Sequence, residues 1–202
     1  MTGRSERQSD RQRSNAVRTF ICIEVPQSIR ERIARLQEAL GRHEARISWV
    51  KPSNIHLTIK FLGDVEAARI PAVCSAAERA VRLSSTFDIE VGGAGCFPSA
   101  KSPRVFWVGL TAVPNPLAQL HGSIENELAS EGFPREARRF SPHLTIGRVR
   151  SPKQASLVAE ELMRDGFDAE SFRVVEVIVM RSDLNAMGSV YTPIVKLKVG
   201  RQ

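Results

Sequence analysis

The sequence predicts an α+β fold built from two related lobes, and three observations support this. Segments with the β-branched and aromatic composition of strands alternate with segments whose apolar residues recur at helical spacing. Several predicted strands alternate apolar and polar residues, which favours antiparallel pairing. The tetrapeptide HLTI begins at His56 and again 87 positions later at His143, with a predicted helix on either side of each copy. We therefore expect one domain over residues 18–200, in which each lobe contributes one HLTI strand.

The first elements of the domain follow from composition and spacing. Residues 19–25 (TFICIEV) have the composition of a buried strand, which Pro26 ends. Residues 28–40 carry apolar side chains on one helical face, between Ser28 as a predicted N-cap and Gly41 as a stop.

The later elements are predicted by the same signals. Gly, Pro and Ser residues mark turns and loops between them, and GGAG at 92–95 is assigned to a loop. The expected order is strands over 47–50 and 55–62 around a turn at 52–54, a helix from Pro71, strands over 86–91 and 104–110, a helix striped by Leu117, Leu120, Ile124 and Leu128 and closed by Gly132, a strand over 142–149, a helix over 157–163, and strands over 171–180 and 190–199 with a turn at 187–188.

The N-terminal residues 1–17 have a different composition from the rest of the chain. They are polar and rich in arginine and serine, so they cannot bury enough apolar surface to offset the entropy of ordering. We expect a disordered basic tail. Five arginines and two acidic residues in the first eighteen positions contribute +3 of the formal net charge of +7. That charge suits an anionic partner such as nucleic acid, and equally a merely solubilising surface.

Cysteine usage and hydropathy exclude several classes of protein. The three cysteines are widely spaced and form no CxxC pair, so they predict neither a disulfide framework nor a zinc site. This usage indicates a reduced, cytoplasmic compartment. The N-terminus has no apolar segment typical of a secretory signal, and the apolar runs are too short to cross a membrane.

The two HLTI strands carry the candidate chemistry. Residues i and i+2 of a strand point to the same face, so His56 lies beside Thr58, and His143 beside Thr145, opposite the apolar leucines and isoleucines. If the lobes face each other, two imidazoles and two hydroxyls converge. Histidine titrates near neutral pH and can act as general acid or base, while threonine hydroxyls can donate to phosphate oxygens. This set suits cleavage of a phosphodiester without a metal ion or cofactor.

A single histidine in a strand is more often structural than catalytic, and the repetition of the motif is what favours catalysis. His43 and His121 lack this context and are expected to be structural or solvent-facing. No cluster of metal ligands, P-loop, G-x-G-x-x-G or G-x-S-x-G motif occurs.

Three further residues are candidate substrate contacts, each with a structural alternative. Arg148 can contact an RNA phosphate or form a surface ion pair. Phe61 can stack on a base, although strand parity places it with Leu57 in the core. Lys60 shares parity with His56, so it can raise the positive potential near the site or simply lie at the rim of the cleft.

The chain resembles the RNA 2′,3′-cyclic phosphodiesterases, historically called 2′-5′ RNA ligases, of the two-histidine (2H) phosphoesterase superfamily. The resemblance runs from about Arg18 to Val199. It rests on RTFICIEVP, WVKPSNIHLTIKFLGDV, GAGCFPSAKSPRVFWVGL, PLAQLHGSIENELASEGFP, RRFSPHLTIGRVR and VIVMRSDL. Cys22 and Gly147 stand where the family often has alanine, and neither is expected to touch the H-x-T residues.

The resemblance implies a bilobal fold in which two antiparallel sheets line a central cleft, with helices outside. It also implies metal-independent hydrolysis of RNA 2′,3′-cyclic phosphate ends to 2′-phosphates. The oligomeric state is left open by the sequence, in which nothing requires more than a monomer. His56 would be the proton donor, His143 the proton acceptor, and Thr58 and Thr145 the phosphate ligands. Reversible 2′-5′ ligation, with tRNA halves as RNA partners, is an additional activity that it leaves open.

Two other functions remain open from the sequence. The basic charge also fits a non-catalytic RNA- or nucleotide-binding module, although such a module gains little from two titratable imidazoles. The same chemistry also fits a phosphodiesterase for a small cyclic phosphate.

Overall fold

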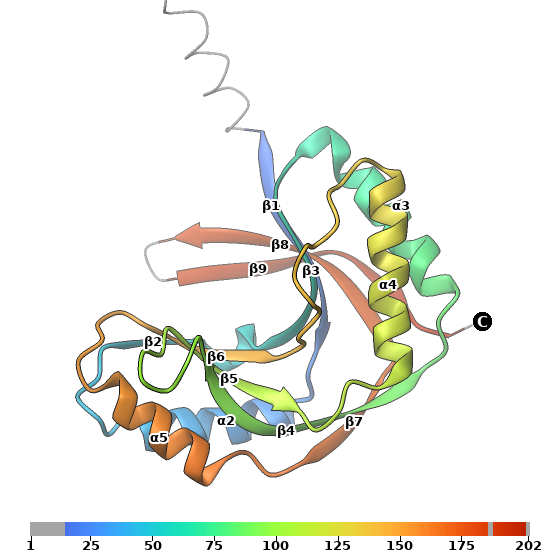
Figure 1. Cartoon of the computed structure of the whole chain (residues 1–202). Coiled ribbons are helices and arrows are strands. Elements are labelled where there is room, and N and C mark those ends of the chain that lie inside the picture. The colour runs from blue at the N-terminus through green and yellow to red at the C-terminus, as the bar shows by residue number, and fades with distance from the viewer. Residues whose placement is uncertain (1–14, 186–187, 201–202) are drawn as a thin grey trace, which may run out of the picture.

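The computed structural model describes residues 15–185 and 188–200. Figure 1 shows helices on the outside of a strongly curled sheet. The strands are β1 (Ala16–Glu24), β2 (Ile47–Trp49), β3 (His56–Glu66), β4 (Phe87–Phe97), β5 (Val105–Leu110), β6 (Leu144–Val149), β7 (Glu170–Val174), β8 (Glu176–Asn185) and β9 (Gly188–Lys198). The helices are α2 (Gln27–Leu40), α3 (Ile70–Arg82), α4 (Asn115–Ser130) and α5 (Ala155–Asp165), with short 3₁₀ turns η1 (Pro52–Asn54) and η2 (Ala67–Arg69).

The strands follow one path in the order β7-β4-β5-β6-β3-β1-β8-β9, with β2 paired to β6. Every pairing between described strands is antiparallel. The link between β3 and β6 is a single pair, Leu57 with Leu144. That link divides the path into a His56 sheet (β3, β1, β8, β9) and a His143 sheet (β6, β2, β5, β4, β7). The predicted α+β fold with two antiparallel halves is therefore confirmed, and the halves are joined where the two HLTI strands meet.

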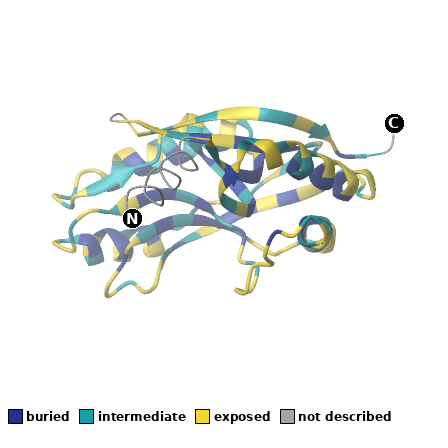
Figure 2. Ribbon diagram, turned by 90° about the horizontal axis from the view of Figure 1, so that it is seen from above, coloured by how far each residue is buried: buried dark blue, intermediate teal, exposed yellow. Residues whose placement is uncertain are grey.

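Helices α2 and α4 each pack on the half opposite to the one that contains the preceding strand. Helix α2 follows β1 of the His56 sheet but packs under the His143 sheet with α5. Its Gln37 Nε2 donates to the Ile146 carbonyl of β6 at 2.8 Å. Helix α4 follows β5 of the His143 sheet but packs with α3 behind the His56 sheet. Figure 2 shows the buried residues on the strands and on the helix faces turned toward them.

Several predicted boundaries need correction. The predicted N-cap Ser28 lies inside α2, which begins after Pro26, and its Oγ donates instead to Glu170 Oε1 at 2.6 Å. The predicted loop at 92–95 belongs to β4, in which a bulge follows Val91 and Gly93 takes a positive φ of 67°. The sequence signal fails because glycine weakens a strand pattern without always ending it.

The predicted strand over 171–180 is in fact two strands in different halves. β7 ends at Val174 and pairs with β4, whereas β8 begins at Glu176 and pairs with β1 and β9. Val175, 55% exposed, carries the chain from one sheet to the other. No turn signal marks this point, because the sequence SFRVVEVIVM contains no glycine, proline or asparagine between the two strands.

At the N-terminal end of the domain, β1 begins at Ala16, three residues before the strand predicted over 19–25. Most of the predicted disordered tail, and part of the predicted turn at 187–188, lie outside the described residues. None of the helices described is long and apolar enough to span a bilayer.

Candidate active site

The contact between β3 and β6 brings the two motifs together. Leu57 and Leu144 pair across the strands and are 1% and 0% exposed, so they face the core. One residue to either side of that pair, the antiparallel register sets His56 against Thr145 and Thr58 against His143. All four side chains therefore lie on the opposite face from the leucines. The arrangement has approximate twofold symmetry, with one imidazole and one hydroxyl from each half.

Both imidazoles are held in the same tautomer. Nδ1 of His56 lies 2.8 Å from the Asn54 carbonyl oxygen, and Nδ1 of His143 lies 2.8 Å from that of Ser141. A carbonyl can only accept, so Nδ1 must carry a proton in each ring. Nε2 is thus the nitrogen that can gain or lose a proton in each histidine.

Two aromatic side chains pack against the His56 ring. Phe20 of β1 stacks on its ring with centroids 4.7 Å apart, and Tyr191 of β9 meets it edge-on at 5.2 Å. Burial among these groups lowers the pKa of His56 below its ordinary value near 6.5, and the hydrogen bond to the Asn54 carbonyl acts in the opposite direction. In the free protein His56 therefore favours its neutral form.

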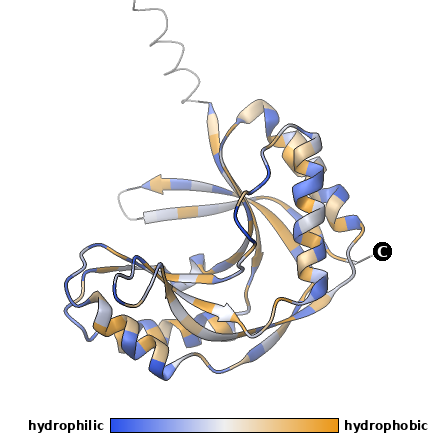
Figure 3. Ribbon diagram, viewed as in Figure 1, coloured by the Kyte–Doolittle hydropathy of each residue, from blue (hydrophilic) through white to orange (hydrophobic). Residues whose placement is uncertain are grey.

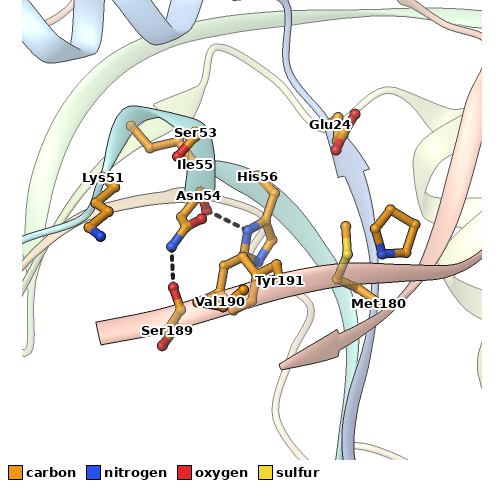
Figure 4. A pocket seen from close by; sticks show the side chains of 11 residues that line it. Glu24, Lys51, Ser53, Asn54, Ile55, His56, Met180, Ser189, Val190 and Tyr191 are labelled. Carbon is orange, nitrogen blue, oxygen red and sulfur yellow. Dashed lines mark hydrogen bonds between the residues drawn. The ribbon is translucent and has the colours of Figure 1, made fainter. Parts of the chain in front are cut away.

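A pocket of about 340 Å³ lies beside His56. Figure 4 shows its lining residues from β1, η1, β3 and the β8–β9 hairpin. Asn54 connects two sides of the pocket, because its Nδ2 donates to the Ser189 carbonyl of β9 at 2.7 Å while its own carbonyl holds His56. These two hydrogen bonds fix the position of the β8–β9 hairpin relative to the first motif.

Two aromatic side chains also lie beside the His143 ring. Phe97 meets its ring edge-on at 5.1 Å, and the centroid of Trp107 lies 6.5 Å away. Trp107 pairs with Thr145 across β5 and β6, and its Nε1 is buried without a hydrogen-bond partner among the described residues. A Cβ at Gly95 would come within 2.5 Å of the Trp107 ring, so only glycine leaves room for the indole.

A β-bulge in the first motif reverses the sides of the strand to which Lys60 and Phe61 point. In the β1–β3 ladder Cys22 pairs with Thr58 but Ile21 pairs with Lys60, so Ile59 is the extra residue. The bulge shifts the parity of the strand by one position. Lys60, 5% exposed, points into the core side, and the expectation that it lies at the cleft rim is wrong. Phe61 is 47% exposed instead of packed in the core.

After the bulge, Phe61 lies on the same face as Thr58. It pairs with Phe20 of β1, and the Arg18 guanidinium lies 4.8 Å from its ring centroid. Cys22 is also nearer the site than expected, because it stands directly opposite Thr58 in the ladder. Only long-range pairing reveals these positions.

The second motif also contains a β-bulge. Trp107 pairs with Thr145 and Phe106 with Gly147, so Ile146 is bulged. The bulge places Arg148, which pairs with Val105, on the face of Thr145. Arg148 is exposed, and the structure gives it no ion pair within residues 15–185 and 188–200. The surface ion pair considered as an alternative for this residue is therefore absent from the described contacts.

A buried ion pair behind the site was missed by sequence analysis. Lys60 Nζ lies 2.7 Å from Glu125 Oε1 of α4, with the two side chains 4% and 7% exposed. His121 Nε2 lies 3.8 Å from the same oxygen, which makes this histidine structural, as expected. The only sequence signal was a charged residue at a buried position of each element. No group of three or more candidate metal ligands occurs in the part of the chain that the structure describes.

Comparison with known proteins agrees with this geometry. The profile of the 2′-5′ RNA ligase superfamily matches residues 25–186. An RNA 2′,3′-cyclic phosphodiesterase from Methanothermobacter thermautotrophicus is 33% identical over 177 residues, which cover 87% of this chain and 95% of the relative. One from Archaeoglobus fulgidus is 32% identical, covering 88% of this chain and 93% of the relative.

Solved structures show the same fold. E. coli LigT in complex with 3′-AMP superposes with a TM-score of 0.74 at 28% identity, covering 92% of this chain and 99% of LigT. E. coli LigT in complex with phosphate gives a TM-score of 0.73 at 26% identity, with coverage of 93% and 99%. The match of the profile and of these relatives over most of the chain shows that the protein belongs to the 2′-5′ RNA ligase superfamily.

Proposed function

We propose that this protein hydrolyses the 2′,3′-cyclic phosphate ends of RNA to 2′-phosphates, with His56 and His143 as its acid–base pair. The observation that carries the proposal is the Leu57–Leu144 pair. It sets two H-x-T strands against each other, with the Nε2 atom of each imidazole left to exchange protons. The names of the curated relatives support the same reaction and substrate class.

The reaction needs one proton removed and one delivered. Water attacks phosphorus, and the bond from phosphorus to the 3′-oxygen breaks. Nε2 of His143 accepts the proton of the water, and protonated His56 donates its Nε2 proton to the departing 3′-oxygen. The approximate symmetry of the site fits either assignment, and the resemblance to the family is what assigns His56 as donor.

Substrate binding prepares His56 for the donor role. Burial lowers its pKa in the free protein, so the ring is mostly neutral there at pH 7. An anionic phosphate beside the ring favours the charged form and raises that pKa. The proton donor is thus generated when the substrate arrives. Thr58 and Thr145 stand on the same face and donate hydrogen bonds to the non-bridging oxygens, where negative charge grows.

Two exposed residues on this face support binding of the rest of the nucleotide. Arg148 offers a guanidinium without a competing ion pair in the described contacts, which suits a phosphate oxygen. Phe61 offers a half-exposed ring to a base, although Arg18 lies over it in the free protein. Lys60 is excluded from direct contact by its burial.

Reversible ligation is the same chemistry with another nucleophile. A 2′-5′ linkage is formed when a 5′-hydroxyl takes the place of water and the bond from phosphorus to the 3′-oxygen breaks, and the reverse step cleaves that linkage; tRNA halves supply such ends. The same acid–base pair serves both reactions. Incubation of RNA halves with cyclic phosphate and 5′-hydroxyl ends, followed by analysis of linkage, tests this activity.

The test of the proposed function is hydrolysis of a short RNA ending in a 2′,3′-cyclic phosphate, in EDTA, with the product identified by ³¹P NMR. We expect turnover to a 2′-phosphate, and a loss of at least about 100-fold in kcat for His56→Ala and for His143→Ala. His43→Ala, which removes a histidine outside both motifs that pairs with Glu161 of α5, is the control. Full activity in either motif variant would refute the acid–base pair.

Two other results would indicate a different function or substrate. Tight, salt-sensitive binding of RNA without turnover would indicate a binding module. Turnover of nucleoside cyclic phosphates with none for RNA ends would indicate a small cyclic phosphate as substrate.

A further inference from the structure

The loop that leads into the second motif has an unusual charge distribution. Residues 134–140 (PREARRF), here called the arginine loop, contain Arg135, Arg138 and Arg139 with a single acidic residue, Glu136. All three arginines are exposed, and the structure gives them no ion pair within its described residues. Figure 3 shows this hydrophilic segment running from the end of α4 toward β6.

Only some of the exposed arginines elsewhere in the described structure are neutralised by carboxylates. Those without an ion pair among the described residues are Arg18, Arg35, Arg42, Arg46, Arg69, Arg104, Arg148 and Arg150. Arg79 pairs with Glu127 and Glu131, and four further exposed arginines pair with a single carboxylate each. Those single pairs are Arg82 with Glu78, Arg164 with Asp165, Arg173 with Asp88 and Arg181 with Asp183. The arginine loop differs from the other unpaired arginines because it places three of them within five consecutive residues, just before the second motif.

The arginine loop is also held in place from beneath. The Lys60 ammonium donates to the Pro134 carbonyl at 2.9 Å, and the backbone N–H of Glu136 donates to Glu125 Oε2 at 3.1 Å. At the other end, the Phe140 ring stacks on His121 with centroids 4.0 Å apart and planes 12° apart. These contacts involve buried partners, so the backbone of the loop is fixed although it has no regular secondary structure. The three arginines therefore extend from a backbone whose position is held.

The position of the loop relates it to the end of a bound strand. Arg139 precedes His143 by four residues, so its Cα lies at most about 14 Å from that of the catalytic candidate. A few nucleotides of single-stranded RNA cover that distance. A nucleoside cyclic phosphate has no upstream phosphodiester to place there.

We propose that the arginine loop binds the phosphodiester backbone of single-stranded RNA upstream of the cyclic phosphate end. The proposal rests on the proposed function and adds a second contact region to it. Guanidinium groups bind phosphate oxygens through paired N–H donors, and each contact releases counterions from the RNA. The loop thereby distinguishes an RNA end from a free nucleoside cyclic phosphate.

The experiment compares two substrates in two triple variants. The first variant, Arg135→Gln/Arg138→Gln/Arg139→Gln, neutralises the arginine loop. The control, Arg82→Gln/Arg164→Gln/Arg173→Gln, neutralises three ion-paired arginines on α3, α5 and β7. The substrates are cytidine 2′,3′-cyclic phosphate and a ten-nucleotide RNA with the same terminal nucleotide.

We expect the loop variant to lose about tenfold or more in kcat/KM for the RNA at low salt, through KM, with the mononucleotide unchanged within about twofold. Its salt dependence should weaken by a log–log slope of about 2, since each lost contact with a single strand accounts for about 0.7. The control variant should match the wild type on both substrates. Equal losses on both substrates, or an equal loss in the control, would overturn the inference.

Fluorescence anisotropy with the same RNA ending in a 3′-hydroxyl separates this inference from the proposed function, because that RNA cannot undergo the reaction. Weaker binding by the loop variant alone supports the arginine loop as an RNA surface even in the absence of turnover. Equal affinity of the loop variant and the wild type refutes it. Unchanged RNA affinity together with lost binding to anionic lipid vesicles would assign the loop to a membrane surface instead.

Discussion

Replacing Lys60 by methionine should destabilise the protein strongly although the residue touches no substrate. Lys60 and Glu125 are 4% and 7% exposed, and their charged atoms lie 2.7 Å apart. With an effective dielectric constant near 20, charges 2.7 Å apart attract by about 6 kcal/mol. Lys60→Met removes this attraction and leaves the Glu125 carboxylate buried. We expect the free energy of unfolding to fall by about 3–5 kcal/mol, a large part of a typical stability of about 5–15 kcal/mol.

Urea denaturation followed by circular dichroism measures this loss. At an m-value of about 2–3 kcal/mol per molar, the midpoint should fall by about 1–2 M. The double variant Lys60→Met/Glu125→Gln should recover at least about half of the loss, because the amide oxygen of glutamine still accepts from Glu136 N–H without a buried charge.

A surface pair provides the matched control for that experiment. Arg173 and Asp88 are 59% and 60% exposed, so Arg173→Met should cost less than about 1 kcal/mol. A loss below about 1 kcal/mol for Lys60→Met, or a double variant no more stable than the single one, would refute the assignment of a stabilising buried pair.

Three further predictions concern the site and its surroundings. Because the pKa of His56 is lowered, the unfolded state takes up a proton before the folded state as pH falls. Stability should therefore decline from about pH 6.5 down through the lowered folded value, less so in His56→Gln, and an NMR titration midpoint above 6.5 in the free protein would contradict this. Gly95→Ala should displace Trp107 and lower kcat with only a modest loss of stability; unchanged kcat would show that the indole is not needed beside His143. Burial raises the pKa of Cys22 to about 12, so iodoacetamide at pH 8 should label it only after unfolding, and labelling of the native protein would contradict its burial.

Sequence reasoning reached the elements whose signals are local. The helix face of α2, the strand composition of β1 and the stop at Gly41 depend on neighbouring residues, and the structure confirms them. The repeated HLTI gave both histidines and both threonines, because a period of two places each pair on one face whatever the partner strand is. The family resemblance depends on the same local motifs.

Register and sheet membership could not be read from local patterns. Strand parity holds only until a bulge, and the bulges at Ile59 and Ile146 form because neighbouring strands pair there with unequal numbers of residues. They send Lys60 into the core and bring Phe61 and Arg148 to the face of the site. Likewise, no local turn signal separates β7 from β8, which belong to opposite halves.

The sequence by itself thus determined which residues are the candidates for the chemistry, since a histidine and a threonine two positions apart share a face in a regular strand. Only the tertiary structure decided that the two motifs meet, through the Leu57–Leu144 pair between strands that begin 87 residues apart in sequence. It also decided that Lys60 supports the loop leading to His143 from beneath. The physical reason is that pairing between distant strands, and the burial of charge that follows from it, depends on the whole chain and not on any one segment of it.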